Sequence, residues 1–149
     1  MPNLPPEEVR AHVLAEHTRL REASARLAQG ALPTARKVGH AALRRLVAEL
    51  RTVALEHAAL EERELVPLLL EADAWGSVRV EQLRDRHHRV LRALEAFANE
   101  LAEGKHGACD LVARIVEVID PLFHDMEEEE ATIDGQVRGS TVVVDQTDG

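Results

Sequence analysis

Two short motifs in this 149-residue chain combine a histidine with a glutamate one helical turn later. They are His57-Ala-Ala-Leu-Glu61 and His124-Asp-Met-Glu-Glu128. Residues four apart lie above one another on the same face of an α-helix, so each motif can direct an imidazole and a carboxylate at one point. Imidazole and carboxylate together are typical ligands of iron, manganese or zinc. The two motifs therefore predict a metal centre with ligands from two helices.

A separate histidine precedes each motif. The separation between His17 and His87 nearly equals that between His57 and His124, so the chain resembles a repeat of two halves. Each half supplies one lone histidine and one motif. We predict six metal ligands and no catalytic residue beyond them: His17, His57, Glu61, His87, His124 and Glu128.

The other histidines fit this plan less well. His88 is the alternative to its neighbour His87, but the apolar spacing places His87 on the core-facing stripe and His88 one residue away from it. His12 belongs to a His-x3-Glu spacing without a counterpart in the other half of the chain. We predict surface positions for His40 and His106.

Four long helices are expected to position these ligands. Glycine and proline are sparse, and apolar residues recur at alternating spacings of three and four between them. His17, His57 and His87 each occupy a position on such a stripe where an apolar residue is expected. His124 lies at the edge of the last stripe, where Pro121 either kinks the helix or restarts it. The predicted helices cover about Pro6 to Gln29, Thr34 to Ala72, Ser77 to Glu103 with Ser77 as N-cap, and Ala108 to Ile133.

Short loops between long helices favour antiparallel neighbours. The predicted fold class is therefore all-α, an antiparallel up-down-up-down four-helix bundle over residues 1–133. Counted along such helices at about 1.5 Å per residue, the four predicted ligand histidines reach a similar depth in the core. Residues 134–149 are expected to form a flexible C-terminal tail, in which Thr141-Val-Val-Val144 could form an edge strand.

Composition excludes several classes of function. A net charge of −9 argues against a nucleic-acid surface, which needs a basic face. No segment approaches the roughly 18 consecutive apolar residues that indicate a membrane-spanning helix. The N-terminal residues lack the basic and apolar blocks of a signal peptide, so we expect a cytoplasmic protein without membrane contact. The single cysteine, Cys109, rules out a thiolate metal cluster within one chain.

The ligand pattern and the segment Glu56–Pro67 resemble the hemerythrin-like, or HHE cation-binding, domains over about residues 8–133. This resemblance implies a four-helix bundle whose cofactor is two iron ions, oxo- or hydroxo-bridged, and whose partners are O2, peroxide or nitric oxide. The oxygen carriers of that family have a His-x3-His pair on the third helix, whereas Leu91 follows His87 at that spacing here. Four histidines, two bridging glutamates and a bridging oxygen would leave one of about six positions open on each iron, which favours turnover of a small oxidant.

Two other functions stay open at this point. A binding protein of the same family would store or sense iron or oxygen without turnover, with the bundle ordered by its metal. A helical bundle with no metal would use the same apolar stripes. The leading hypothesis is a di-iron protein that consumes peroxide, O2 or nitric oxide.

Overall fold

The computed structural model describes residues 3–31, 40–104 and 108–145, with only the backbone given at residues 40, 108–109 and 140–145. These residues form four helices, α1 (Pro6–Gly30), α2 (His40–Ala72), α3 (Gly76–Glu103) and α4 (Ala108–Asp145). No strand occurs in these ranges, which confirms the prediction of an all-helical chain with four helices. No helix in the described ranges has an apolar stretch long enough to cross a membrane.

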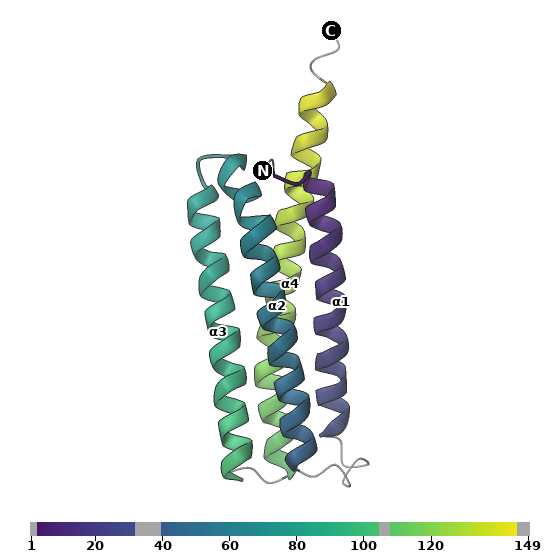
Figure 1. Ribbon diagram of the computed structural model, residues 1–149, viewed down its shortest axis with the longest axis vertical. Coiled ribbons are helices and arrows are strands. Elements are labelled where there is room, and N and C mark those ends of the chain that lie inside the picture. Colours follow the sequence, from purple (N-terminus) through teal and green to yellow (C-terminus); the bar gives the residue numbers. More distant parts are fainter. Residues whose placement is uncertain (1–2, 32–39, 105–107, 146–149) are drawn as a thin grey trace.

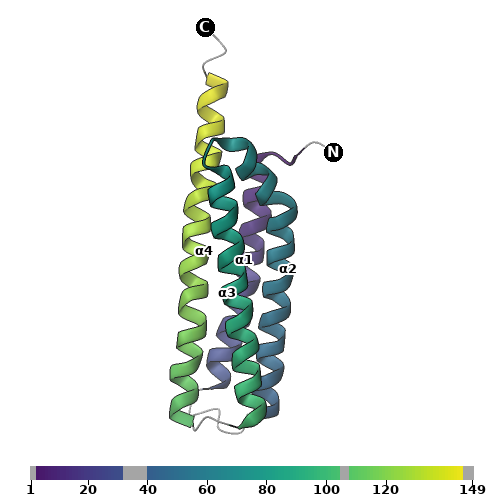
Figure 2. The same ribbon diagram turned by 90° about the vertical axis from the view of Figure 1, so that its left-hand side faces the viewer.

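The four helices lie side by side, and the colour gradient runs in opposite directions in consecutive helices (Figures 1 and 2). Helix α2 packs extensively against both α1 and α3, and α4 packs mainly against α1. The pairing of α3 with α4 is less extensive than the other three. The side of the bundle between α3 and α4 is therefore its most open side.

Local sequence explains where two of the helices begin and end. Proline at the first position of α1 already has the backbone angle of a helix, and Glu7 and Glu8 place negative charge at the positive end of the helix dipole. Gly104 follows α3 with φ of 66°, the left-handed conformation that glycine adopts without strain. The first feature favours the start of α1 at Pro6, and the second ends α3 at Glu103.

The core consists of two separate apolar clusters. One contains Leu20, Leu50, Phe97 and Ile115 among its members, and the other contains Val13, Leu65, Leu83 and Ile133 among its members. In every helix, the residues of the two clusters are separated by a short interval of sequence. His17, His57, His87 and Glu129 fall within these four intervals, so a polar layer lies between two apolar layers.

Helix α4 is longer than the sequence predicted. It continues through Asp134 and Gly135 to Asp145, so the predicted helix end at Ile133 is wrong, and so is an edge strand at residues 141–144. Ile133 is buried and Val137 packs against the second apolar cluster, which extends the helical stripe. That packing offsets the cost of glycine within a helix, about 1 kcal/mol. The last turns extend beyond the other helices (Figure 1).

The start of α3 also differs from the prediction. Trp75, not Ser77, is the capping residue, and it makes no side-chain cap. Instead, the carboxylate of Asp73 accepts a hydrogen bond from the Trp75 backbone N–H at 2.8 Å and pairs with Arg79 at 2.9 Å. The start expected for the second helix at Thr34 and the surface position expected for His106 lie outside the described residues.

Gly76 marks a close approach between the end of α2 and the start of α3. A Cβ atom on Gly76 would lie 2.1 Å from the backbone oxygen of Leu69. We expect Gly76→Ala to lower the free energy of unfolding by about 1–3 kcal/mol, because backbone must move to make room. At Gly135 a Cβ would meet nothing within 4 Å, so Gly135→Ala should raise stability by about 0.5–1 kcal/mol. Urea unfolding of both variants checks this, and equal effects of the two substitutions would contradict it.

Candidate metal centre

Five ionisable side chains meet in the middle of the bundle, and all four helices contribute. His17 comes from α1, His57 and Glu61 from α2, His87 from α3 and Glu129 from α4. His17 and Glu61 are completely buried, and His57 and Glu129 are each 4% exposed. The His87 side chain is 16% exposed and lies nearest to solvent. Burial of this many ionisable groups together is expensive unless they compensate one another.

The three imidazoles direct their Nε2 atoms at the two carboxylates. His17 Nε2 lies 3.4 Å and His57 Nε2 lies 3.6 Å from the same oxygen, Oε2 of Glu129. His87 Nε2 lies 3.5 Å from Glu61 Oε2 and 3.9 Å from Glu129 Oε1. His57 Nε2 also contacts Glu61 Oε1 directly. Each carboxylate therefore faces more than one imidazole.

Several of these atoms are buried without a hydrogen bond of ordinary geometry. They are Nε2 of His17, Nε2 of His87, both carboxylate oxygens of Glu61 and Oε2 of Glu129. Native structures rarely leave such atoms unsatisfied, and an ion is a recognised explanation. Ligand-capable atoms of His17, His57, Glu61 and Glu129 all lie within 4.8 Å of one another. The donor set therefore fits a cation of the iron, manganese or zinc type.

Charge within the layer is balanced by opposite shifts in pKa. Burial alone would lower the pKa of His57, but the carboxylates of Glu129 and Glu61 raise it to about 10. Burial is likewise outweighed at His87, where the same carboxylates raise the pKa to about 9. Burial would raise the pKa of Glu129, but the three imidazoles hold it well below its ordinary value. Protonated imidazoles can thus stand in for a cation when none is bound.

A further glutamate orients the first of the imidazoles. His17 Nδ1 lies 3.0 Å from Glu130 Oε1, and the same oxygen accepts a hydrogen bond from Arg21 Nη2 at 3.0 Å. A carboxylate at Nδ1 fixes the ring and leaves Nε2 free to act as a ligand. Burial opposes ionisation of Glu130, but His17 and Arg21 lower its pKa below the ordinary value. Arg21, Glu130 and His17 form a chain from the surface to the layer.

The structure brings four of the six predicted ligands into this layer and leaves two outside it. His124 and Glu128 have side chains that are 69% and 49% exposed, and they pair with each other at 3.1 Å. Glu129 occupies the position on α4 that the prediction gave to Glu128. Successive residues differ by about 100° around a helix, so a shift of one position moves a side chain from the surface to the core.

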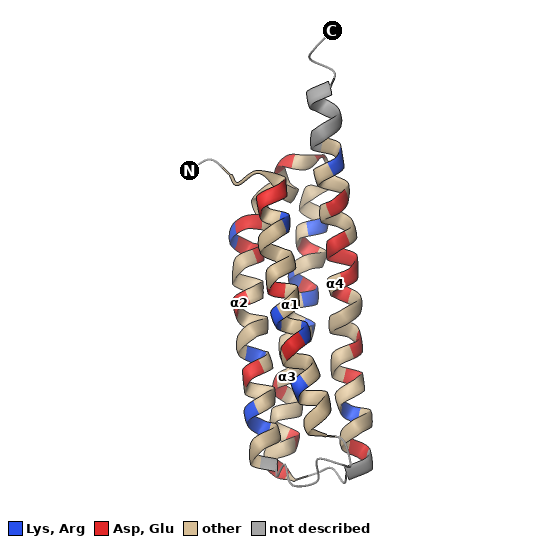
Figure 3. Ribbon diagram, turned by 90° about the vertical axis from the view of Figure 1, so that its right-hand side faces the viewer, with Lys and Arg blue, Asp and Glu red and all other residues tan. Residues whose placement is uncertain are grey.

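The sequence does contain a signal for Glu129. Four consecutive glutamates, Glu127–Glu130, supply a carboxylate at every angle around α4, and Figure 3 shows acidic residues following one another along this helix. The buried residues Leu122, Met126 and Ile133 define the core-facing stripe. Glu129 continues that stripe at the alternating spacing of three and four, whereas Glu128 does not.

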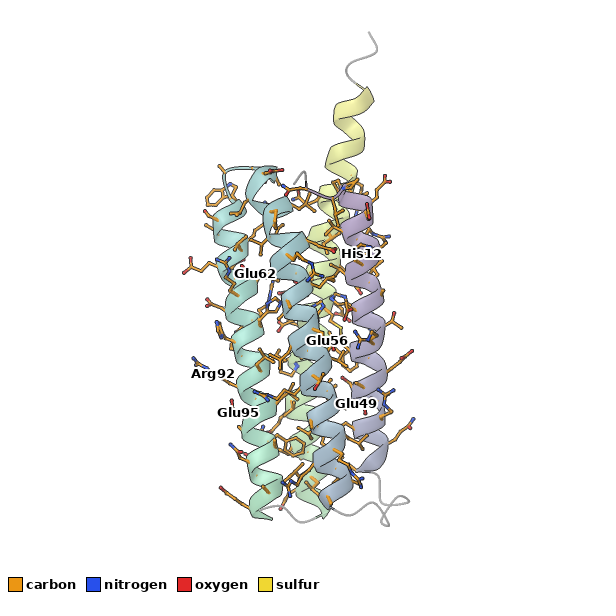
Figure 4. All side chains as sticks on the ribbon, in the orientation of Figure 1. His12, Glu49, Glu56, Glu62, Arg92 and Glu95 are labelled. Atoms are coloured by element: carbon orange, nitrogen blue, oxygen red, sulfur yellow. The ribbon has the colours of Figure 1, made fainter. Side chains whose placement is uncertain are left out.

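The remaining described histidines lie away from the layer. His88 is exposed on α3, so His87 and not His88 is the neighbour that faces the other ligands. His12 on α1, labelled in Figure 4, places its Nδ1 atom 2.7 Å from Glu64 Oε2. The side chain of His40 and all of His106 lie outside the described part of the chain.

Comparison with known proteins supports a cation-binding domain. The family described as the hemerythrin HHE cation binding domain matches residues 9–134, a span that includes all five side chains of the layer. Comparison with curated proteins and with solved structures gives no match. The family match covers most of the sequence and confirms the predicted resemblance. The chain therefore belongs to the hemerythrin HHE cation-binding domain family.

Proposed function

We propose that the protein holds iron in the buried layer and reacts there with a small oxidant, namely O2, peroxide or nitric oxide. The observation that carries this proposal is the convergence of buried imidazole nitrogens and carboxylate oxygens from all four helices, several of them without a hydrogen bond. Membership of a cation-binding family supports it independently.

The contacts within the layer leave each carboxylate able to serve more than one ion. Glu61 presents Oε1 to His57 and Oε2 to His87, and Glu129 presents Oε2 to His17 and Oε1 to His87. If two ions are bound, Glu61 and Glu129 would be shared between them and His17, His57 and His87 would complete the ligand set. Five side chains cannot fill the octahedral coordination of two ions, so positions remain for a small molecule.

The protein chain would position the ligands of the iron and keep water out of the buried layer. Iron would supply the Lewis acid and would pass electrons from an external reductant to the oxidant. The apolar clusters on both sides of the layer, with Leu20 and Phe97 on one side and Leu65 and Leu83 on the other, keep bulk water away from it. Glu130 holds His17 in the orientation that ligation requires. The proposal replaces the four-histidine, two-glutamate centre expected from sequence with three histidines, Glu61 and Glu129.

Substitution along the glutamate run of α4 tests which carboxylate belongs to the centre. We expect Glu129→Gln to weaken iron binding by more than about 100-fold. Loss of a residue that only orients a ligand already lowers metal affinity by about 10–100-fold. Glu127→Gln, an exposed change in the same run, is the matched control and should bind iron like the parent protein. Iron per chain after anaerobic dialysis against Fe(II) measures both. Loss of iron from Glu128→Gln but not from Glu129→Gln would contradict the assignment.

The pKa shifts predict how stability of the metal-free protein changes with pH. Because the pKa values of His57 and His87 are raised to about 10 and 9, their contribution to stability is complete below the ordinary imidazole pKa of about 6.5. It is lost as pH rises through about 9 to 10. Urea unfolding in the presence of a chelator should therefore show a free energy of unfolding that falls from about pH 6.5 to about pH 10. His57→Gln should reduce this fall in the free energy of unfolding, whereas His12→Gln should retain it. Equal slopes of the free energy against pH in the two variants would refute the raised pKa of His57.

Reaction with each oxidant tests the activity itself. Protein loaded with iron and given an excess of an added reductant should consume peroxide, O2 or nitric oxide in amounts that exceed its own iron content, measured with each oxidant separately. The same amount of iron with chelator-stripped Glu129→Gln protein is the control and should consume far less. Reversible binding of O2 without consumption of any of the three would identify a carrier or sensor instead.

A further inference from the structure

Two connected hollows open between α3 and α4 beside the candidate centre. The outer one, about 1060 Å³, is lined only by residues of these two helices. The inner one, about 320 Å³, also touches Leu65 and Leu69 of α2 and reaches the metal-site residue Glu129. Three residues line both hollows: Gln82, Arg86 and Glu128. Together the hollows connect the surface with the buried layer.

An ion pair lies at the boundary between the hollows. Arg86 Nη1 donates a hydrogen bond to Glu128 Oε2 at 2.8 Å. The Arg86 side chain is only 17% exposed, and its Nε atom is buried without an acceptor among the described residues. A buried guanidinium N–H without an acceptor is costly, and a small anion at this place would satisfy it with a charge-assisted hydrogen bond.

Other directions to the layer are more closely packed, although the His87 side chain, which lines neither hollow, is 16% exposed. Along the bundle axis the two apolar clusters cover it, and the pairings of α2 with α1 and α3 are the most extensive in the molecule. The inner hollow has apolar walls at Leu65, Leu69 and Leu83. Its other walls are polar, with Gln82, Arg86 and Glu128 among them, and its volume admits a species of a few atoms.

We propose that the seam between α3 and α4 is the access route for small molecules to the metal centre, and that Arg86 selects small anions along it. This inference rests on the proposed function, since a metal at Glu129 is the end of the route. Arg79 also lines the inner hollow, but it is paired with Asp73. Without the positive charge of Arg86, the carboxylates of Glu128 and Glu129 would therefore repel an anion from this hollow. A neutral molecule would be indifferent to that charge.

Two substitutions that break the same ion pair should change anion access in opposite directions. Arg86→Met keeps bulk but removes the cation, so the association rate of azide with the ferric protein should fall by about 10-fold or more. Glu128→Gln leaves Arg86 without its counter-charge, so the azide rate should rise. The association rate of nitric oxide, a neutral probe, with the ferrous protein should differ from the parent rate by no more than about twofold in both variants. That difference is far below the roughly tenfold or larger electrostatic effect expected for azide. Stopped-flow absorbance measures all of these rates.

A matched control separates selection from loosening of the bundle. Arg84 on α3 also forms an ion pair with a neighbouring helix, because it contacts Glu62 of α2. Glu62 is labelled in Figure 4. Arg84 lines neither hollow. Arg84→Met should bind azide and nitric oxide at the rates of the parent protein. If the Arg86–Glu128 pair only stabilises the bundle, both variants should change the association rates of both probes in the same direction.

Iron content of each protein is measured before the rates. Failure of the parent protein to take up iron overturns the proposed function, and this inference with it. Normal iron uptake with the same azide rate in Arg86→Met and Arg84→Met overturns the access route alone. Loss of iron from Arg86→Met also overturns it, because Arg86 would then support the centre itself.

Discussion

Mutual neutralisation of buried imidazoles and carboxylates is the interaction on which the rest of this bundle depends. Three histidines and two glutamates lie between two apolar clusters, where a single uncompensated charge would be very costly. Carboxylates raise the pKa of His57 and His87 so that protons supply the positive charge. A bound cation would supply the same charge and release those protons. The layer is thus a place where protons and a metal ion compete.

The helices are arranged to hold this layer in position from every side. Each helix places an apolar stripe on both sides of its own contribution, so the residues of the layer cannot move toward solvent without exposing core. The pair of Glu130 and Arg21 fixes the ring of His17 from the outside. The hollows in the seam between α3 and α4 connect the layer with the surface, and Arg86 and Glu128 line both of them.

Much of this arrangement follows from sequence, and the exceptions have a common cause. His17, His57 and His87 replace apolar residues on otherwise regular stripes, so their positions in the core could be predicted, and Glu61 follows from its spacing to His57. The rotation of α4 could not be predicted from motif spacing, because consecutive glutamates offer a carboxylate at every angle. The buried neighbours Met126 and Ile133 decide it in favour of Glu129. The predicted end of α4 at Ile133 is wrong because Gly135 signals a stop that packing of Val137 overrides.

The most direct test of the central claim is a crystal structure of the iron-loaded protein with anomalous data collected at the iron edge. Our account predicts anomalous peaks between the Nε2 atoms of His17, His57 and His87 and the carboxylates of Glu61 and Glu129. Peaks at the surface beside His124 and Glu128, or no peak within the bundle, would contradict it.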